Sequence, residues 1–193
     1  MLTEKGYAVT HGILNAVDFG VPQNRCRLFV VGHRGRKVPD LPKPGVQSRV
    51  TVRDAIHDLP KLANGASADW LPYRRQASSG YGKQLRQSLS GCSNHLVTRN
   101  ASHVIHRYAF VPPGGNWESI PERLMRNYTD RSRCHTGIYH RLHYDRPSVV
   151  IGNFRKNMLI HPHSDRGLSV RETCSSNDSA GVGSLRRQAP FPM

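Results

Sequence analysis

The sequence predicts an α/β protein, and its 193 residues suffice for one domain or for a small domain plus part of another. Three observations support this fold class. Residues 28–31 form an apolar run that ends at a glycine, as a strand does. Residues 51–60, TVRDAIHDLP, have the spacing of a short capped helix. Between residues 95 and 160, short apolar runs alternate with turns, which predicts short strands on a small domain.

Polar side chains occupy alternate positions just before the first apolar run, in GVPQNRCRLFVVGHR (residues 20–34). Side chains alternate across a strand, so Gln23, Arg25 and Arg27 are expected on one face. The run Leu28–Val31 then predicts a buried strand. An amide and two guanidiniums on one face suit a planar acid, a phosphate or a base edge. The alternative is a solvated strand edge.

The segments around this strand predict a sheet edge followed by a linker. Residues 1–16 predict a helix or a short lead-in, although Tyr7, Val9 and Ile13 alternate as in a strand. Three prolines within residues 33–48 exclude a helix or a central strand there.

The helix over residues 51–60 has a clear start and stop. Thr51 and Asp54 have the spacing of a capping box, and Pro60 ends the helix. Residues 61–94 are polar with few aliphatics and predict an irregular loop.

A second capping box, Ser169–Glu172, marks a helix start, but apolar periodicity does not follow it. We therefore expect residues 173–193 to form a disordered tail.

Charge points to the class of partner. The formal net charge is +15, the pI is near 10.4, and 22 of the 28 basic residues are arginines. Arginine makes bidentate hydrogen bonds to phosphates and guanines, so nucleic acid is the first partner to consider. No apolar run approaches the ~20 residues of a spanning helix. The N-terminus has no signal-peptide core, which indicates a cytoplasmic protein.

The four cysteines favour neither disulfides nor a metal. They are widely separated and form no Cys-x-x-Cys pair. Cys92-x-x-His95 followed by His103-x-x-His106 loosely imitates zinc spacing, but the paired cysteines are missing, so no metal site is expected.

Five stretches, in the same order along the chain, resemble the DNA (cytosine-5) methyltransferases. The family's eighth motif, Gln-x-Arg-x-Arg after a Gly-Val-Pro turn, is similar to LNAVDFGVPQNRCRLFVVG. Segments leading into and through the target-recognition domain resemble TVRDAIHDLP, SNHLVTRNASHVIHRYAFVPPGGNW and GIYHRLHYDRPSVVIGNF. The start of the ninth motif is similar to HPHSDRGLSVRE, so the resemblance runs from about residue 6 to Glu172.

This resemblance implies a domain organisation. The fold would be an α/β fragment, in which the closing strands of a Rossmann-like methyltransferase sheet join a small mixed, β-rich target-recognition domain. Its parts would be the end of the catalytic domain (1–34), the linker and recognition domain (35–160), the return to the catalytic domain (161–172) and the tail (173–193).

The resemblance also implies a reaction and roles in it. These enzymes flip a cytosine out of duplex DNA, a cysteine thiolate attacks C6, and C5 takes a methyl group from S-adenosylmethionine. By motif position, Arg25 and Arg27 would hold the flipped nucleotide by its O2 edge and adjacent phosphate, and Gln23 would orient them. A fixed cation near O2 would stabilise the charge that develops during the attack.

Three family motifs are absent from this sequence. No cysteine follows a proline, no glutamate precedes an asparagine, and there is no Phe-x-Gly-x-Gly stretch. We therefore expect the chain to begin after the catalytic half and, alone, to bind no S-adenosylmethionine and transfer no methyl group. The expected partner is double-stranded DNA, as in restriction-modification. The chain is then either a degenerate fragment or one half of a split enzyme, whose complementary chain carries the catalytic half.

Other residues are assigned by position in the resemblance or by charge. We expect contacts between the two domains from Arg166 and Glu172. Contacts with DNA are expected from the arginines of the recognition segment, namely Arg99, Arg107, Arg126, Arg131, Arg133 and Arg141. A turn over residues 114–117 should pack Trp117 inward.

Two other functions are alternatives to that of a methyltransferase. A non-catalytic, basic DNA-binding module would explain the charge without a catalytic partner. An RNA-binding protein is disfavoured, because no aromatic-rich strand resembles an RNA-stacking platform.

Overall fold

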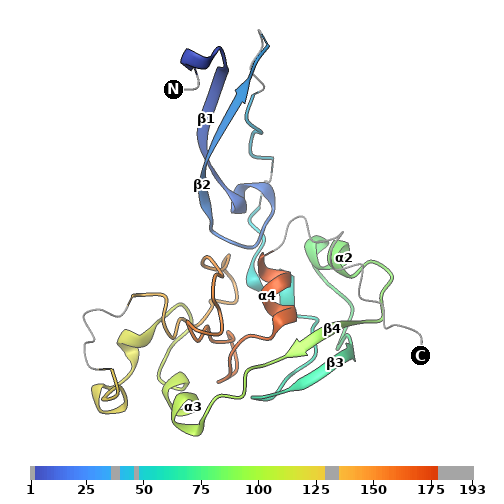
Figure 1. Cartoon of the computed structure of the whole chain (residues 1–193). Coiled ribbons are helices and arrows are strands. Elements are labelled where there is room, and N and C mark those ends of the chain that lie inside the picture. Colours follow the sequence, from blue (N-terminus) through green and yellow to red (C-terminus); the bar gives the residue numbers. More distant parts are fainter. Residues whose placement is uncertain (1–2, 36–39, 46–47, 129–134, 178–193) are drawn as a thin grey trace.

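Short helices and two-stranded antiparallel sheets are joined by long irregular segments (Figure 1). The structure is a computed structural model that describes residues 3–35, 40–45, 48–128 and 135–177. Its elements are η1 (Thr3–Lys5), β1 (Ala8–Asn15), η2 (Ala16–Phe19), β2 (Cys26–His33), α1 (Val52–Ile56), β3 (Ser67–Pro72), α2 (Gly80–Arg86), β4 (Gly91–Leu96), α3 (Ser102–Tyr108), η3 (Trp117–Ser119), η4 (Glu122–Leu124) and α4 (Val170–Asn177).

Strands β1 and β2 form a hairpin that projects from the rest of the molecule (Figure 1). Their register runs from Ala8 opposite His33 to Asn15 opposite Cys26. The turn between them contains η2, which ends at Gly20 in the left-handed conformation (φ 81°) that glycine adopts without strain. The predicted strand at 27–31 is therefore confirmed. Of the two alternatives for residues 1–16, the strand indicated by the alternation of Val9 and Ile13 forms over Ala8–Asn15, and a helix does not.

The apolar run of β2 is not buried, which corrects the sequence-based expectation. The side chains of Leu28, Phe29 and Val30 are 65%, 46% and 53% exposed. The hairpin is a sheet of only two strands, and no second layer covers its faces within the described residues. An apolar strand is buried only where another layer packs on it.

Backbone hydrogen bonds anchor the base of the hairpin. The amide of Asn24 donates to the Ser148 carbonyl (2.8 Å), and the Ser148 amide donates to the Pro22 carbonyl (2.8 Å). Beside this anchor, Val17 and Val21 are buried. The hairpin is thus tied at its turn end to a loop far along the chain.

The predicted helix forms as α1, but it ends at Ile56, before the expected stop at Pro60. The Asp54 carboxylate accepts the Thr51 amide (2.9 Å), and the Thr51 hydroxyl accepts the Asp54 amide (3.3 Å). This capping box starts the helix, and its apolar residues are buried: Val52, Ala55 and Ile56.

Residues 61–94 are not an irregular loop as expected. They form β3, α2 and β4, with Ser67 opposite Leu96 and Pro72 opposite Gly91. The sequence did not indicate a strand at β4, because this strand buries the small residues Gly91, Cys92 and Ser93 in place of aliphatic ones.

The short strands expected between 95 and 160 are also wrong beyond the end of β4. Helix α3 covers SHVIHRY, with Val104, Ile105 and Tyr108 spaced to reach the core on one helical face. Downstream, within the described residues, pairing is limited to single bridges such as Arg141 with Ile160. Trp117 packs inward, as expected.

Helix α4 continues well past Glu172, although the sequence predicted only its start. The second capping box is formed, with the Glu172 carboxylate accepting the Ser169 amide (2.8 Å). The helix buries Thr173, Ser175 and Ser176, so its packed face is made of small polar residues that give no apolar period. The rest of the expected tail, residues 178–193, lies outside the described residues.

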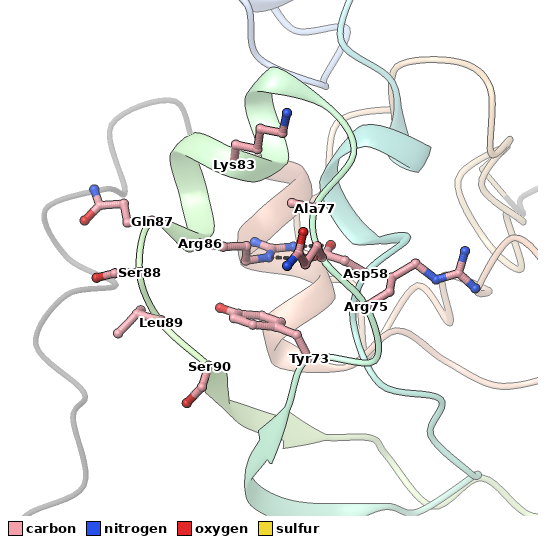
Figure 2. Close-up of a pocket in the computed structure, with 11 residues that line it drawn as sticks. Asp58, Tyr73, Arg75, Ala77, Lys83, Arg86, Gln87, Ser88, Leu89 and Ser90 are labelled. Carbon is pink, nitrogen blue, oxygen red and sulfur yellow. Dashed lines mark hydrogen bonds and ion pairs between the residues drawn. The ribbon is translucent and has the colours of Figure 1, made fainter.

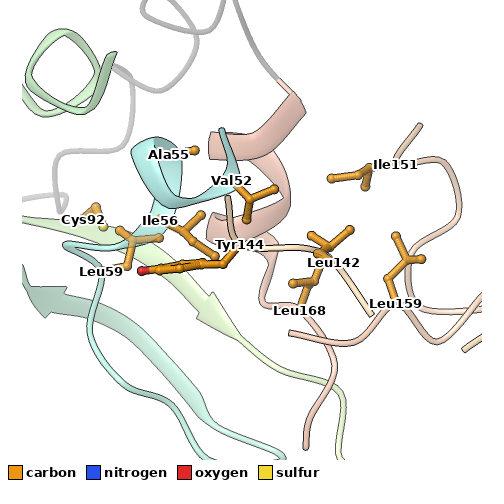
Figure 3. Packing of buried hydrophobic residues seen from close by; sticks show 10 residues of the cluster. All are labelled: Val52, Ala55, Ile56, Leu59, Cys92, Leu142, Tyr144, Ile151, Leu159 and Leu168. Carbon is orange, nitrogen blue, oxygen red and sulfur yellow. The ribbon is translucent and has the colours of Figure 1, made fainter. Parts of the chain in front are cut away.

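Two hydrophobic clusters form the core. In the first, α1 packs against α4 and several loop residues meet between them (Figure 3). Leu142 is fully buried there beside Val52 and Leu168. The second cluster lies around α3 and consists of Tyr108, Val111, Ile120, Met125, Tyr139 and Ile160.

We expect Leu142→Ala to lower the free energy of unfolding by about 2–5 kcal/mol, because it leaves a cavity in the first cluster. The matched control, Leu28→Ala on the exposed face of β2, should change it by less than about 0.5 kcal/mol. Urea denaturation measures both. Equal losses would contradict the placement of Leu28 on an uncovered face.

Acid is expected to destabilise the fold through His161. Burial, together with the nearby Arg166 guanidinium, lowers the pKa of His161 to about 4 even though the Glu172 carboxylate opposes the shift. Below pH 6.5 the unfolded chain binds a proton at this histidine that the folded chain refuses, so the free energy of unfolding falls as the pH drops from 6.5 to 4. Urea denaturation at several pH values measures this slope. His161→Gln should flatten it relative to the unaltered chain, and parallel curves would exclude the assignment.

Candidate functional site

Arg25 and Arg27 line one cavity at the turn end of the hairpin. The cavity measures about 620 Å³, and its wall is largely apolar, with Phe19 and Phe29 from the hairpin and Leu41 from the linker. Phe29 and Val31 of β2 line the same cavity, so the alternation along the strand puts both arginines on its side. The predicted common face is thus present for these two residues.

Local hydrogen bonds set the backbone of this site. The Asn15 side chain accepts the Arg25 amide (2.8 Å), and the Arg25 carbonyl accepts the Ala16 amide (3.0 Å). Arg27 is exposed, and its Nη1 donates to the Cys26 carbonyl (2.7 Å). Both guanidiniums lack a carboxylate partner within the part of the chain that the structure describes. Asp40 is an acid in the cavity lining.

Gln23 does not lie on the same face as the two arginines. It precedes β2, forms an isolated bridge with Ser148, and is 1% exposed. Its Nε2 finds no hydrogen-bond partner among the described residues. The residue therefore belongs to the anchor of the hairpin, through its bridge with Ser148, and does not line the cavity.

Two of the arginines assigned to DNA are buried, which corrects the expectation of surface cations. Arg107 donates to the Leu124 carbonyl (2.8 Å) and the Tyr139 hydroxyl (2.7 Å). Arg141 donates to the carbonyls of Val111, His161, Ser164 and Tyr108 and forms an ion pair with Asp165. Their donors are occupied by the fold, because the surrounding loops leave buried carbonyls that need partners.

The other arginines assigned to DNA differ in position. Arg99 and Arg126 are exposed and lie on separate segments. Arg131 and Arg133 lie outside the described residues. The structure therefore does not gather the predicted set into one patch, and contact with DNA remains a prediction for its exposed members.

Arg166 and Glu172 form a buried bidentate ion pair at the start of α4. Their nitrogen–oxygen distances are 2.7 and 2.9 Å. The guanidinium and the Ser169 amide keep the pKa of Glu172 below its usual value, although burial acts in the opposite direction. The pair joins α4 to the segment before it, and its role between two domains remains a prediction.

A second cavity, of about 530 Å³, lies between α2 and the strands β3 and β4 (Figure 2). The ion pair of Arg86 with Asp58 is buried on one side of it (2.6 and 2.9 Å), beside the ring of Tyr73. Lys83 and Arg75 also line it. Sequence reasoning missed this region, because residues 61–94 were expected to be irregular; the Arg74–Arg75 pair was the signal available.

The zinc-like pattern is not assembled. Cys92 and His95 are buried in contact (Sγ to Nε2, 3.4 Å), whereas His103 and His106 lie on the exposed side of α3. The described residues contain no group of three His, Cys, Asp or Glu arranged for a metal ion. None of the helices in the described ranges is long and apolar enough to cross a membrane.

Comparison with known proteins identifies relatives of this chain. The family model for C-5 cytosine-specific DNA methylases matches residues 1–176. The Type II methyltransferase M1.HphI of Haemophilus parahaemolyticus is 33% identical over 168 residues, which cover 86% of this chain and 37% of that protein. DNA (cytosine-5)-methyltransferase 1B of Oryza sativa subsp. japonica is 28% identical, with 91% of this chain and 15% of that protein covered.

A solved structure shares the fold. The crystal structure of a DNA modification methyltransferase encoded within an E. coli prophage has a TM-score of 0.63 and 19% identity, and the match covers 89% of this chain and 50% of that one. The chain therefore spans at most half the length of these three relatives. Because the family model matches nearly all of it, this chain belongs to the C-5 cytosine-specific DNA methylase family, whose named relatives here are DNA (cytosine-5)-methyltransferases and Type II methylases.

Proposed function

We propose that this chain is the DNA-binding and target-holding portion of a DNA (cytosine-5)-methyltransferase. The observation that carries the proposal is the cavity shared by Arg25 and Arg27, which lie in a segment that resembles the family's Gln-x-Arg-x-Arg motif. In this reading, residues 1–34 contribute closing strands to a Rossmann-like sheet, 35–160 form the recognition domain, and 161–172 return to the catalytic domain. The enzyme acts on DNA inside the cell.

The cavity has the chemistry that an extruded pyrimidine needs. The rings of Phe19 and Phe29 offer apolar walls, and a volume of about 620 Å³ falls in the range of about 300–1,000 Å³ typical of small-ligand sites. One guanidinium hydrogen-bonds O2 of the base, and the other holds the adjacent phosphate. A cation fixed near O2 stabilises negative charge on the ring when C6 is attacked.

The residues present do not fit S-adenosylmethionine, the methyl donor of the family. Its sulfonium is a cation, whereas both cavities described above are lined by arginines, and Asp58 in the second is already paired with Arg86. The sequence also lacks the Pro-Cys, Glu-Asn and Phe-x-Gly-x-Gly stretches. The contribution of these residues is therefore to bind and orient the base, and the nucleophile and the donor site belong to the part of the enzyme that they do not include.

A preference for unpaired cytosine tests the role of the cavity. Flipping costs least when the base is already unpaired, so the chain should bind a duplex with cytosine opposite an abasic site about tenfold more tightly than the fully paired duplex, a difference of about 1.4 kcal/mol. Arg25→Ala with Arg27→Ala should abolish this preference. Fluorescence anisotropy with labelled duplexes measures the two affinities.

The control for this experiment removes the same charge elsewhere. Lys61→Ala with Arg123→Ala alters two exposed cations remote in sequence from the hairpin and should keep the preference. If both double variants lose it equally, or if the unaltered chain shows none, the cavity is not a base site.

A methyl-transfer assay tests the division of labour. The chain alone, incubated with labelled S-adenosylmethionine and cytosine-containing DNA, should incorporate no label above background, because it has no Pro-Cys nucleophile. Incorporation would refute this part of the proposal.

A second function, a basic DNA-binding module without a catalytic partner, is favoured by the net charge of +15 alone. Such a module binds DNA with strong salt dependence but has no reason to prefer an unpaired cytosine. The abasic-site experiment therefore separates the two functions.

A further inference from the structure

The two consecutive arginines Arg74 and Arg75 are both held by one residue, His57. The Nη2 of Arg74 donates to the His57 carbonyl (3.1 Å), and the Nη1 of Arg75 donates to the His57 Nε2 (2.8 Å). Both arginines are exposed, and both acceptors are neutral. The guanidiniums are therefore oriented by the fold while their charge is not compensated.

His57 itself is fixed and uncharged. Its Nδ1 is hydrogen-bonded to the Tyr144 hydroxyl, which leaves Nε2 as the acceptor for Arg75. Burial and the charges of Arg75, Arg74 and Arg53 lower the pKa of His57, so the ring is neutral near pH 7. A neutral acceptor orients Arg75 without cancelling its charge.

The acidic residues near Arg74 and Arg75 already have partners of their own. Asp54 closes the capping box of α1 through Thr51. Asp58 is paired with the buried Arg86. On the facing loop, Asp145 pairs with Arg53 (2.5 Å), which lies over the Tyr144 ring.

Arg74 and Arg75 thus keep their charge, and within the described residues neither has an ion pair. Two adjacent like charges repel each other, and a bound anion removes that repulsion. Figure 2 shows the Arg75 side chain directed away from α2 and Lys83, and the residue is exposed.

We propose that Arg74 and Arg75, anchored on His57, form a phosphate-binding site that contacts the backbone of double-stranded DNA. The guanidinium fork matches the geometry of phosphate oxygens. Because DNA carries a phosphate charge every ~1.7 Å along its axis, neighbouring phosphates can engage both side chains. The site lies outside the cavity of Arg25 and Arg27, and its assignment to DNA rests on the function proposed above.

The salt dependence of DNA binding by the full chain tests this site. Each phosphate contact contributes about −0.9 to the slope of log K against log salt concentration, so Arg74→Gln with Arg75→Gln should make the slope less negative by about 1.8. Arg74→Lys with Arg75→Lys keeps both charges and should keep the slope, while affinity falls because the forks are lost. The matched control, Lys61→Gln with Arg123→Gln, removes the same charge elsewhere and should shift the slope less.

The outcomes separate this inference from the function on which it rests. No binding of duplex DNA by the unaltered chain would remove both. Binding with an unpaired-cytosine preference, but with equal slope changes in the glutamine variants at 74/75 and at 61/123, would overturn only this site. A thermal-shift response to inorganic phosphate that the 74/75 glutamine variant loses, with its duplex affinity unchanged, would replace DNA by a small anion and so overturn the assignment.

Discussion

Buried guanidiniums hold this fold together, because most of the chain is irregular and its buried carbonyls lack the partners that a helix or a sheet would supply. A guanidinium offers five donors from one residue, and an unpaired buried carbonyl costs about 1–3 kcal/mol. Around Arg141 alone, four carbonyls from two segments, 108–111 and 161–164, converge. Among the described residues outside the hairpin, five arginines are at most 5% exposed: Arg86, Arg107, Arg141, Arg166 and Arg171. Part of the +15 charge therefore comes from buried arginines. The number of cations at the surface is smaller than the net charge suggests.

Features that depend on neighbouring residues were predictable from the sequence. Both capping boxes form, because Thr51 with Asp54 and Ser169 with Glu172 need only a spacing of three residues. The alternation of Arg25 and Arg27 along one strand places them on a common cavity for the same reason. By contrast, the sequence did not predict the full length of α4, because a helix that buries serine and threonine has no apolar periodicity.

Features that depend on distant segments were not predictable. Whether Leu28 and Val30 are buried depends on a covering layer, about which the composition of the strand says nothing. Gln23 left the expected face because it pairs with Ser148, more than a hundred positions away. The burial of Arg107 and Arg141 follows from carbonyls contributed by remote loops, so their type and position suggested surface cations. The family resemblance indicated where these segments belong, and only the three-dimensional contacts separated structural arginines from exposed ones.

The two backbone hydrogen bonds at Ser148 fix the turn end of the hairpin, and this end also carries the two arginines. At about 3.3 Å per residue, a rotation of roughly 10° about Asn24 moves the far end of β2 by ~5 Å but Arg27 by less than ~2 Å. A tilt of the hairpin therefore displaces the cavity of Arg25 and Arg27 much less than it displaces the far end of the strands. The attachment at Ser148 thus keeps the residues near the turn in place and lets the far end of the hairpin move.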